Sequence, residues 1–433
     1  MPHPRTLIKK MIPHAVFRTI EPWGHLAEAV VANIQHGFPS RHMKIIGVTG
    51  TNGKTTTSFM IQKMLSSAGY KTALMTTVAY GVDEKITPQI AHMTTASAPL
   101  LQQRLAEFKK QGVQWVVLET TSHALAQYRV WGIPYEIAVM TNITHEHLDY
   151  HGTFEHYVRS KLRLFKIAAK HGKKYGVVNA DDPHAERFMA AIPHAVSYGV
   201  EAGELRASDI KLEADGCRYE ARIGSDTYDI HANIPGEFNV YNSMAAVAVG
   251  RKIGLTREQI EIGIESLTGV EGRMDVVDEG QSFTAIIDFA HTPDSFERLL
   301  RDVRAATNGK LITVFGSAGR RDEAKRAIQG EIAGRYSDEV VLTEEDDRDV
   351  DGNEILAQIA EGAIKAGKVK EKDLFLILDR PEAIAFAVGQ ASGSEDTVIF
   401  LGKGHEKTIE RAGGTFDWDE AKEVRLALRA LKQ

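Results

Sequence analysis

One glycine-containing stretch, Ile46-Gly-Val-Thr-Gly-Thr-Asn-Gly-Lys-Thr-Thr-Thr57, constrains the fold more than any other part of the sequence. It overlaps an apolar run from Lys44 to Val48 and precedes a segment with helical apolar spacing that ends at Gly69. The pattern predicts a strand, a tight loop and a helix. The loop departs from strict Walker A spacing, because counting back from Gly53 places Val48 where the first glycine belongs.

The residue types in this loop are those that hold a polyphosphate. Gly50 and Gly53 let the backbone turn so that successive N–H groups point inward, and the helix start adds the positive end of its dipole. Lys54 would supply a charge for the outer phosphates, and the hydroxyl of Thr55 can coordinate magnesium. A plain turn between strand and helix is the alternative, which the run Gly-Lys-Thr-Thr-Thr disfavours.

A magnesium nucleotide site also needs a carboxylate at a neighbouring strand end. Glu119 has this place, because it directly follows the apolar run Trp115-Val-Val-Leu118. The segment 141–152, which follows the apolar run Ile137 to Met140, holds three histidines and two acidic residues, and the segment 119–129 adds Glu119 and one more histidine. A single histidine is more often a satisfied structural residue than a ligand. Their clustering favours a functional site.

Alternating apolar runs and helix-length segments predict an α/β protein. The first region is predicted to be a P-loop-type domain with a mostly parallel sheet and a small antiparallel insert at about 196–232. After Gly272, five more apolar runs predict a Rossmann-like doubly wound sheet, in which ligands bind beyond the carboxyl ends of the strands. We therefore expect a short amphipathic helical segment at 1–43, an ATP-binding domain at 44–270 and a doubly wound domain at 271–433.

Composition limits the cellular compartments and the kinds of partner that are expected for this protein. The 433 residues carry a formal net charge of -6, so no global basic field indicates nucleic acid. The single cysteine, Cys217, excludes an intrachain disulfide framework. With no long apolar run and no export signal, these features predict a cytoplasmic protein. The basic and apolar residues between Leu7 and Phe38 indicate either a helix packed on the next domain, the commoner case, or weak contact with a membrane surface.

A series of motifs, in order from Lys44 to the C-terminus, resembles the Mur ligase superfamily. The motifs are Gly50-Thr-Asn-Gly-Lys-Thr-Thr-Thr57, Glu119 with Ser122-His-Ala-Leu125, Asn142 with His147-Leu-Asp-Tyr-His-Gly152, Gly236-Glu-Phe-Asn-Val-Tyr-Asn242, Gly272-Arg-Met274, Asp288-Phe-Ala-His-Thr-Pro293 and Gly402-Lys-Gly-His-Glu406. Within the superfamily the sequence is most similar to the MurE type, the UDP-N-acetylmuramoyl-dipeptide: diamino acid ligases. The phosphate loop characteristic of that superfamily accounts for the departure from Walker A.

The resemblance implies an ATP-dependent amide ligase of peptidoglycan precursor synthesis. ATP would phosphorylate a carboxylate of a muramoyl-dipeptide, and the amine of a diamino acid would then displace phosphate from the acyl phosphate. This route makes chemical sense because a carboxylate is a poor electrophile until its oxygen becomes a leaving group. The cofactors implied are ATP and Mg²⁺. Meso-diaminopimelate is the favoured amino acid, L-lysine is the next, and we expect a monomer.

The resemblance also implies roles for individual residues. The ATP-binding residues would be Gly50, Thr51, Asn52, Gly53, Lys54, Thr55, Thr56, Asn239, Asn242 and Arg273. The catalytic residues would be Lys54, Glu119, His147, Lys161, Asp288 and His291. The metal ligands would be Thr55, Glu119, His147 and, if carbamylated by carbon dioxide, Lys161. The acceptor substrate would contact Thr94, Thr95, Ser122, Gln127 and Arg129. The amino acid would contact Arg321, Glu345, Asp346, Arg348, Gly402 and Glu406.

Two of the departures from the family pattern concern the substrates. The diaminopimelate-selecting motif Asp-Asn-Pro-Arg is replaced by Glu345-Asp-Asp-Arg348, which retains only the arginine. About forty residues precede Lys44, fewer than the family's separate domain for the uridine diphosphate needs, so the uridine group is held differently or the acceptor lacks it.

Two other functions stay open. One is a superfamily ligase acting on an acceptor without UDP, as a folylpolyglutamate synthase does. The other is an inactive nucleotide-binding scaffold at a membrane. Retention of Lys54, Glu119, His147 and Lys161 argues against the scaffold.

Overall fold

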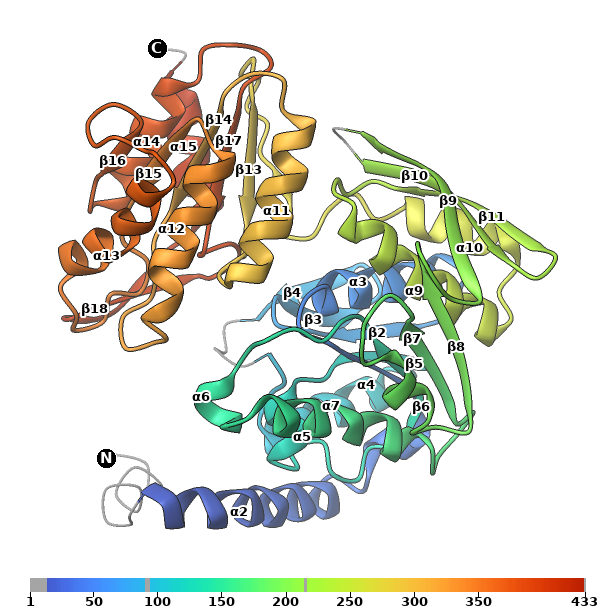
Figure 1. The fold of residues 1–433 in the computed structure, drawn as a ribbon. Coiled ribbons are helices and arrows are strands. Elements are labelled where there is room, and N and C mark those ends of the chain that lie inside the picture. The colour runs from blue at the N-terminus through green and yellow to red at the C-terminus, as the bar shows by residue number, and fades with distance from the viewer. Residues whose placement is uncertain (1–13, 90–93, 214–215, 432–433) are drawn as a thin grey trace. The chain divides into compact units, whose positions relative to one another are not determined.

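The structure, a computed structural model, describes residues 14–89, 94–213 and 216–431 (Figure 1). The chain divides into two compact units, which are described separately below. The first comprises residues up to 208 together with 220–230 and 241–266, and the second comprises 209–219, 231–240 and 267 onward. The division of the chain places the β9–β11 segment partly in each unit.

A large sheet has its centre in the first unit. Its eleven strands lie in the order β11-β10-β9-β8-β7-β6-β1-β5-β2-β3-β4. The strands are β1 (Lys44–Thr49), β2 (Thr72–Met75), β3 (Ala79–Val82), β4 (Lys85–Pro88), β5 (Trp115–Glu119), β6 (Tyr135–Met140), β7 (Tyr175–Asn179), β8 (His194–Gly199), β9 (Leu205–Glu213), β10 (Gly216–Ile223) and β11 (Asp226–Ala232). The strand β1 pairs in parallel with β5 on one side and β6 on the other. The segments that follow β1, β5 and β6 therefore begin at the same edge of the sheet.

Helices cover this sheet because its central strands are apolar on both faces. Ile45, Ile46 and Val48 of β1 are fully buried, as expected for a parallel strand between helical layers. The helices and the one 3₁₀ turn are α2 (His14–Gln35), η1 (Pro39–His42), α3 (Lys54–Ser67), α4 (Ala98–Lys110), α5 (Ser122–Ala126), α6 (Leu148–His151), α7 (Phe154–Ala168), α8 (Ala185–Met189), α9 (Phe238–Ile253) and α10 (Arg257–Glu265). Helix α3 packs on β2, β5 and α10, and α7 packs on β6 and α5.

The second unit contains a six-stranded sheet with the order β12-β13-β17-β14-β15-β16. Its strands are β12 (Asp275–Val276), β13 (Thr284–Asp288), β14 (Leu311–Phe315), β15 (Glu339–Leu342), β16 (Leu374–Leu376) and β17 (Thr397–Leu401), and β18 (Thr408–Arg411) forms a separate hairpin with β19 (Gly414–Asp417). All pairings in the sheet are parallel except that of β12 with β13. The helices are α11 (Pro293–Ala306), α12 (Ala324–Tyr336), α13 (Gly352–Lys365), α14 (Arg380–Gln390) and α15 (Glu420–Ala430).

Both sheets agree with the α/β fold class expected from the sequence, which is confirmed. Each apolar run that was expected to form a strand in the second unit does so. The analysis of apolar runs missed the short hairpin strands β2, β3 and β4, the edge strand β12 and the β18–β19 hairpin. Pro22, which interrupts the apolar pattern, lies inside α2 and does not end it. The domain boundaries stay a prediction.

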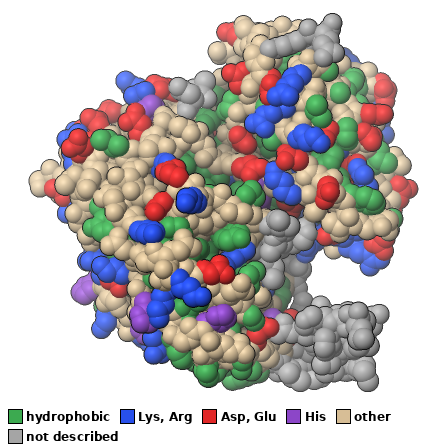
Figure 2. Space-filling view, turned by 180° about the vertical axis from the view of Figure 1, so that it is seen from behind, with side chains coloured by type: hydrophobic (Ala, Val, Ile, Leu, Met, Phe, Trp, Pro, Cys, Tyr) green, Lys and Arg blue, Asp and Glu red, His purple; other side chains and the backbone are tan. Residues whose placement is uncertain are grey.

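The N-terminal segment is only partly described. Residues 1–13 of the expected amphipathic segment lie outside the described residues, and α2 occupies 14–35. Among the helices that the structure describes, none combines the length and the apolar character needed to cross a membrane. On the face shown in Figure 2, acidic and basic side chains are interspersed, in keeping with the many charges of both signs in the sequence.

Helices α12 and α13 approach each other closely through glycine. A Cβ atom built on Gly362 would overlap the carbonyl oxygen of Ala327, and one on Gly330 would overlap that of Ile359. We expect Gly362→Ala to lower the free energy of unfolding by about 1–3 kcal/mol, because the backbone must move to admit the methyl group. Chemical denaturation measures this change.

A control is Gly389 of α14, whose added Cβ atom would meet nothing within 4 Å. There Gly389→Ala should be neutral or raise stability by up to about 1 kcal/mol, because alanine favours the helix. Equal effects of the two substitutions would contradict the close helix packing.

Candidate active site

The loop between β1 and α3 has a backbone shape that requires glycine. Gly53 has a φ of 79°, in the left-handed region, and a Cβ atom there would collide with the side-chain amide of Asn242. Gly50 lies so close to Thr141 that a Cβ atom would overlap the threonine hydroxyl. The amino end of α3 follows directly at Lys54. The loop thus has the geometry expected for a phosphate cradle at a helix start.

Side chains after β6 and on α7 hold this loop in place. The backbone N–H of Asn52 donates to Oδ1 of Asn142 at 2.9 Å, and Nδ2 of Asn142 donates to the carbonyl of Asn52 at 3.0 Å. The hydroxyl of Thr51 lies 2.8 Å from the hydroxyl of Tyr157. These bonds fix the loop without using the amide groups of Gly53 and the residues that follow. The loop is therefore preorganised.

Oxygen ligands of the kind that magnesium prefers meet beside the loop. The hydroxyl of Thr55 donates to Oε2 of Glu119 at 3.0 Å, and Glu119 at the end of β5 is only 1% exposed. The backbone N–H of Thr77 donates to the same oxygen at 3.0 Å. A hydroxyl and a carboxylate at this position fit the donor set of Mg²⁺.

The expected histidine ligand lies in a different group. His147 has its Nε2 3.5 Å from Oε2 of Glu146, and its ring lies edge-on to that of His123 at 4.6 Å between centroids. Within the described ranges, no three histidine, cysteine or acidic side chains are grouped so that they could hold a metal ion. Thr55 and Glu119 thus form a partial ligand set, to which the phosphates of a nucleotide would contribute the remainder.

Two lysines lie at the loop. Nζ of Lys54 donates to the carbonyl of Thr51 at 2.6 Å. Lys161 on α7 is 2% exposed, and its Nζ donates to the carbonyl of Gly50. Burial, with a smaller contribution from Lys54, lowers the pKa of Lys161 well below its usual value, and Glu146 and Glu119 oppose this shift only in part. Burial thus favours the neutral form of the Lys161 amine over its charged form.

The expected acceptor-binding residues gather beyond the carboxyl end of β5. Nη1 of Arg129 donates to the carbonyl of Thr95 at 3.0 Å, and its Nε donates to Oε1 of Gln127 at 2.7 Å. The hydroxyl of Thr95, next to Thr94, donates to the carbonyl of Glu119 at 2.9 Å. The structure thus brings Thr95, Gln127 and Arg129 together.

Histidines complete this group. The hydroxyl of Ser122 lies 3.0 Å from Nε2 of His151. Burial, followed by the neighbouring His147 and His151, lowers the pKa of His123 to about 3. His123 is therefore neutral at physiological pH. It presents a polar ring without a second positive charge beside Arg129.

The two asparagines expected near adenine have different surroundings. The side-chain oxygen of Asn242 accepts a hydrogen bond of 3.1 Å from the hydroxyl of Thr57. Asn239 is fully buried, and its Nδ2 donates to the carbonyl of Pro235 at 2.8 Å. Thr56, another expected ATP-binding residue, is buried in the first turn of α3.

In the second unit, Asp288 binds two backbone N–H groups, and Arg273 lies over the ring of Phe289. Asp288 accepts hydrogen bonds from the backbone N–H of Met274 at 2.8 Å and of Ala290 at 2.7 Å. Burial raises the pKa of Asp288, against the opposing effect of Arg273. The guanidinium of Arg273 lies 4.6 Å from the centroid of Phe289, a cation–π contact. Sequence reasoning did not single out Phe289, although it lies inside a quoted motif.

His291 and His405 lie on the same aromatic ring. Nδ1 of His291 lies 2.9 Å from the carbonyl of Phe289, and the ring of His405 lies 4.9 Å from that of Phe289 between centroids. Burial lowers the pKa of His405 well below its usual value, and the nearby Arg273 adds to this effect. His405 was missed as a candidate, although the motif Gly402-Lys-Gly-His-Glu406 contains it.

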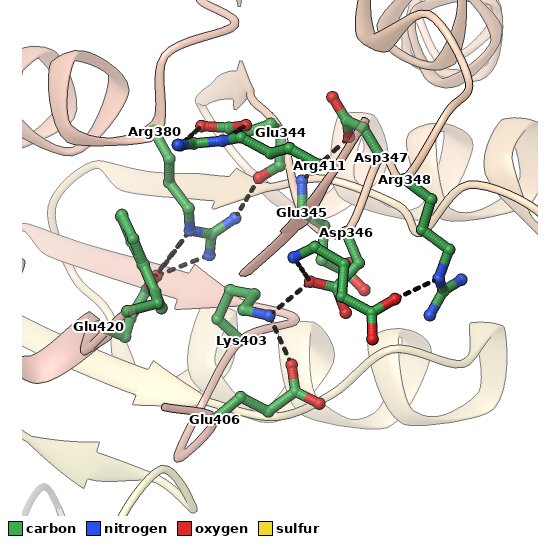
Figure 3. A network of polar contacts seen from close by, with 12 residues as sticks. Glu344, Glu345, Asp346, Asp347, Arg348, Arg380, Lys403, Glu406, Arg411 and Glu420 are labelled. Atoms are coloured by element: carbon green, nitrogen blue, oxygen red, sulfur yellow. Dashed lines mark hydrogen bonds and ion pairs between the residues drawn. The ribbon is translucent and has the colours of Figure 1, made fainter. Parts of the chain in front are cut away.

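The acidic segment after β15 meets the segment after β17 (Figure 3). Nζ of Lys403 lies 2.9 Å from Oδ1 of Asp346 and 2.7 Å from Oε2 of Glu406. Nε of Arg348 donates to Oε2 of Glu410 at 2.6 Å. The sequence analysis missed Lys403 and Glu410 as partners in this site. Asp346 and Glu406 are therefore already paired with a cation.

Glu345 is buried beside Gly402. Its side chain is 7% exposed, and a Cβ atom built on Gly402 would lie 2.7 Å from its Oε2. The φ of Gly402 is 98°, so glycine is required there for two separate reasons. Burial, with the neighbouring Glu344 and Glu345 adding to it, raises the pKa of Asp347 to about 6. Arg321 lies apart from this group of contacts, on the exposed loop after β14.

Comparisons with known proteins agree with the motifs. The family model "Mur ligase middle domain" matches residues 48–250, and "Mur ligase, glutamate ligase domain" matches 272–404. The chain is 42% identical over 424 residues to the UDP-N-acetylmuramyl-tripeptide synthetase of Roseiflexus sp. (strain RS-1), which covers 95% of this chain and 83% of the relative. It is 36% identical over 420 residues to UDP-N-acetylmuramoyl-L-alanyl-D-glutamate--2,6-diaminopimelate ligase 1 of Clostridium acetobutylicum, which covers 96% of this chain and 84% of the relative.

Solved structures are similar as well. A structure of a UDP-N-acetylmuramoyl-L-alanyl-D-glutamate--2,6-diaminopimelate ligase has a TM-score of 0.64 and 32% identity, and covers 90% of this chain and 79% of its own. The folylpolyglutamate synthase of Mycobacterium tuberculosis with ADP has a TM-score of 0.73 at 17% identity, over 92% of this chain and 94% of its own. The second likeness concerns the fold alone.

The depressed pKa of His123 predicts a pH dependence of stability. The usual pKa of histidine in an unfolded chain is about 6.5, whereas that of His123 in the folded chain is about 3. Between these two pH values the unfolded state binds a proton that the folded state excludes, so the free energy of unfolding falls as the pH falls. We expect His123→Asn to flatten this loss between about pH 6.5 and pH 4. Denaturation midpoints measured across that range check it.

His171, which is exposed after α7, provides the control. The variant His171→Asn should leave the slope of stability against pH unchanged. A His123→Asn protein with the slope of the unsubstituted chain would show that His123 is not the group responsible.

Proposed function

We propose a specific ligase reaction for this chain, which belongs to the Mur ligase superfamily of ATP-dependent acid–amino-acid ligases. It is a MurE-like enzyme of peptidoglycan precursor synthesis. The reaction proposed is the joining of a diamino acid to the free carboxylate of a muramoyl-dipeptide. The observation that supports it most is the contact between Thr55 and Glu119 beside a preorganised phosphate loop.

The nucleotide phosphates would lie on residues 50–56, with Lys54 at the outer phosphates and Thr55 and Glu119 as ligands of Mg²⁺. When bound, ATP supplies the phosphoryl group that makes the acceptor carboxylate reactive. The preorganised N–H groups of the loop can hold the developing charge without rearrangement, which is the larger share of catalysis in such reactions. Asn239, Asn242, Arg273, Asp288 and His291 would complete nucleotide binding as the family resemblance implies.

Arg129 is the candidate for orienting the acceptor. Gln127 and the carbonyl of Thr95 fix its guanidinium. A carboxylate of the muramoyl-dipeptide would therefore bind a cation whose side chain is already ordered, at a small cost in conformational entropy. The neutral His123 and Ser122 can supply hydrogen bonds without competing for that charge.

The amino acid that the enzyme adds to the acceptor would be diaminopimelate, with L-lysine as the alternative. The relatives whose names specify the amino acid are 2,6-diaminopimelate ligases. A diamino acid needs anionic groups for its ammonium, and Glu345, Asp346 and Glu406 lie together after β15 and β17. The distal carboxylate of diaminopimelate needs a guanidinium, which Arg348 or Arg321 would provide.

The test is phosphate release from ATP in the presence of UDP-linked and UDP-free muramoyl-dipeptide with a panel of amines. We expect release to require acceptor and amine together, fastest with diaminopimelate, and the product mass to equal the sum of the two less one water. Lys54→Ala should reduce turnover at least about 10³-fold, because it removes charge stabilisation in the transition state. Nucleotide binding without amide formation under every combination would leave the scaffold as the function.

Carbamylation of Lys161 is proposed because its amine is buried beside the phosphate loop, where burial favours the neutral form. The Nζ lone pair would attack carbon dioxide, form an N–C bond and release a proton, which yields a carboxylate beside Gly50. We expect turnover to fall in buffer free of carbon dioxide and to return with bicarbonate. A ¹³C resonance of a carbamate should appear with labelled bicarbonate.

Lys166, exposed on the same helix, is the matched control. Lys161→Gln should lose both the labelled resonance and the response to bicarbonate, whereas Lys166→Gln should keep both. A resonance that survives in Lys161→Gln would place the carbamate on another amine.

A further inference from the structure

Arg380, the first residue of α14, bonds to three segments that are far apart in the sequence. Figure 3 shows it beside Glu344 and Glu420. Its side chain is fully buried. Nη1 donates to the carbonyl of Glu344 at 2.9 Å, and Nη2 donates to the carbonyl of Leu401 at 2.9 Å. Nη2 also donates to Oε1 of Glu420 at 2.6 Å, and Nε donates to Oε2 of the same carboxylate at 2.9 Å. The planar guanidinium thus uses donors on all three of its nitrogens.

The two carbonyls mark the bases of the two segments that carry the proposed amino-acid subsite. Leu401 ends β17, and Glu344 follows the end of β15 by two residues. In the sheet, β14 lies between β15 and β17, so no ladder hydrogen bond joins these strands. Arg380 therefore connects two strand ends that the sheet itself does not tie together. Lys403 connects the same segments further along, through Asp346.

The carboxylate of Glu420 neutralises the buried charge of Arg380. Its side chain is 0% exposed, and it also accepts a hydrogen bond of 2.9 Å from Nε1 of Trp418. It lies in the first turn of α15, where a carboxylate is favoured by the helix dipole. Both carboxylate oxygens are engaged, so Glu420 is not offered to a ligand. The pair contributes geometry to the site and no charge to a substrate.

We propose that Arg380 and Glu420 are positioning residues for amino-acid use. They set the spacing between segment 344–348 and segment 402–406, and hence between Glu345, Asp346 and Glu406. This inference rests on the proposed function, because it assumes that these acidic side chains bind the incoming amine. A shift of about 1 Å between the segments is enough to weaken such an arrangement. ATP binding depends on other residues, so a shift between these two segments should not change the KM for ATP.

The double variant Arg380→Met/Glu420→Met tests this directly. It replaces a buried ion pair by apolar side chains, an exchange that commonly preserves folding. We expect the KM for the amino acid to rise at least about tenfold, with the KM for ATP changed less than about twofold. Amide hydrogen exchange in 344–348 and 402–406 should become faster. Glu420→Gln, which keeps the shape, should change the KM for the amino acid in the same direction by a smaller factor.

Arg304→Met is the matched control. Arg304 also holds two carbonyls, those of Thr307 at 2.6 Å and Gly309 at 2.7 Å, and the carboxylate of Asp338 at 2.7 Å. These bonds lie at the amino end of β14, away from the strand ends that carry the acidic segments. Its loss should lower the melting temperature and leave the KM for the amino acid unchanged.

The outcomes separate the two proposals. An unsubstituted chain that forms no amide with any amine refutes the proposed function, whereas the exchange measurement still decides whether the pair orders the two segments. An active enzyme whose double variant keeps both its KM for the amino acid and its slow exchange overturns the positioning role. The same follows if Arg304→Met raises that KM equally.

Discussion

The position of β1 between β5 and β6 determines what the first unit can do. Because all three strands run parallel, the segments that follow them start at one edge of the sheet, and one hydrogen bond between Thr55 and Glu119 is enough to join the start of α3 to the end of β5. Asn142, after β6, fixes the loop from the other side. Side-chain hydrogen bonds therefore hold the phosphate loop on both flanks, from the end of β5 and from the segment after β6.

Charge is handled differently in the two units. The first unit lowers charge by burial, since Lys161 and His123 both have depressed pKa values for that reason. In the second unit, burial likewise shifts the pKa values of Asp288 and His405 toward their neutral forms, but other charges are paired, with Lys403 between Asp346 and Glu406 and with Arg411 on the carboxylate of Glu344. Under the proposed function, the buried amine of Lys161 would lie at the site of phosphoryl chemistry, and the paired charges of both signs would lie at the site for a zwitterionic amino acid.

Local sequence patterns predicted the features that depend on local structure. The strand, loop and helix around Gly53, the carboxylate at the end of β5 and the doubly wound second sheet all follow from apolar periodicity and glycine placement. The partners of Lys403 and Arg380 could not be predicted, because they are set by segments up to dozens of residues apart and no periodicity reports them. The short strands β2–β4 were missed because four residues carry too weak an alternation. The metal, acceptor and amino-acid assignments rest on the family resemblance and stay predictions.

The pairing of Lys403 has a consequence for recognition. Under the proposed function, an arriving ammonium would meet Asp346 and Glu406 already paired with Lys403, so its binding would require an exchange of partners. Such competition penalises ligands that bring only one charge, since breaking an existing pair needs compensation from a second contact. At the proposed subsite, a ligand with a single amine would therefore bind more weakly than a ligand that adds a second charged contact.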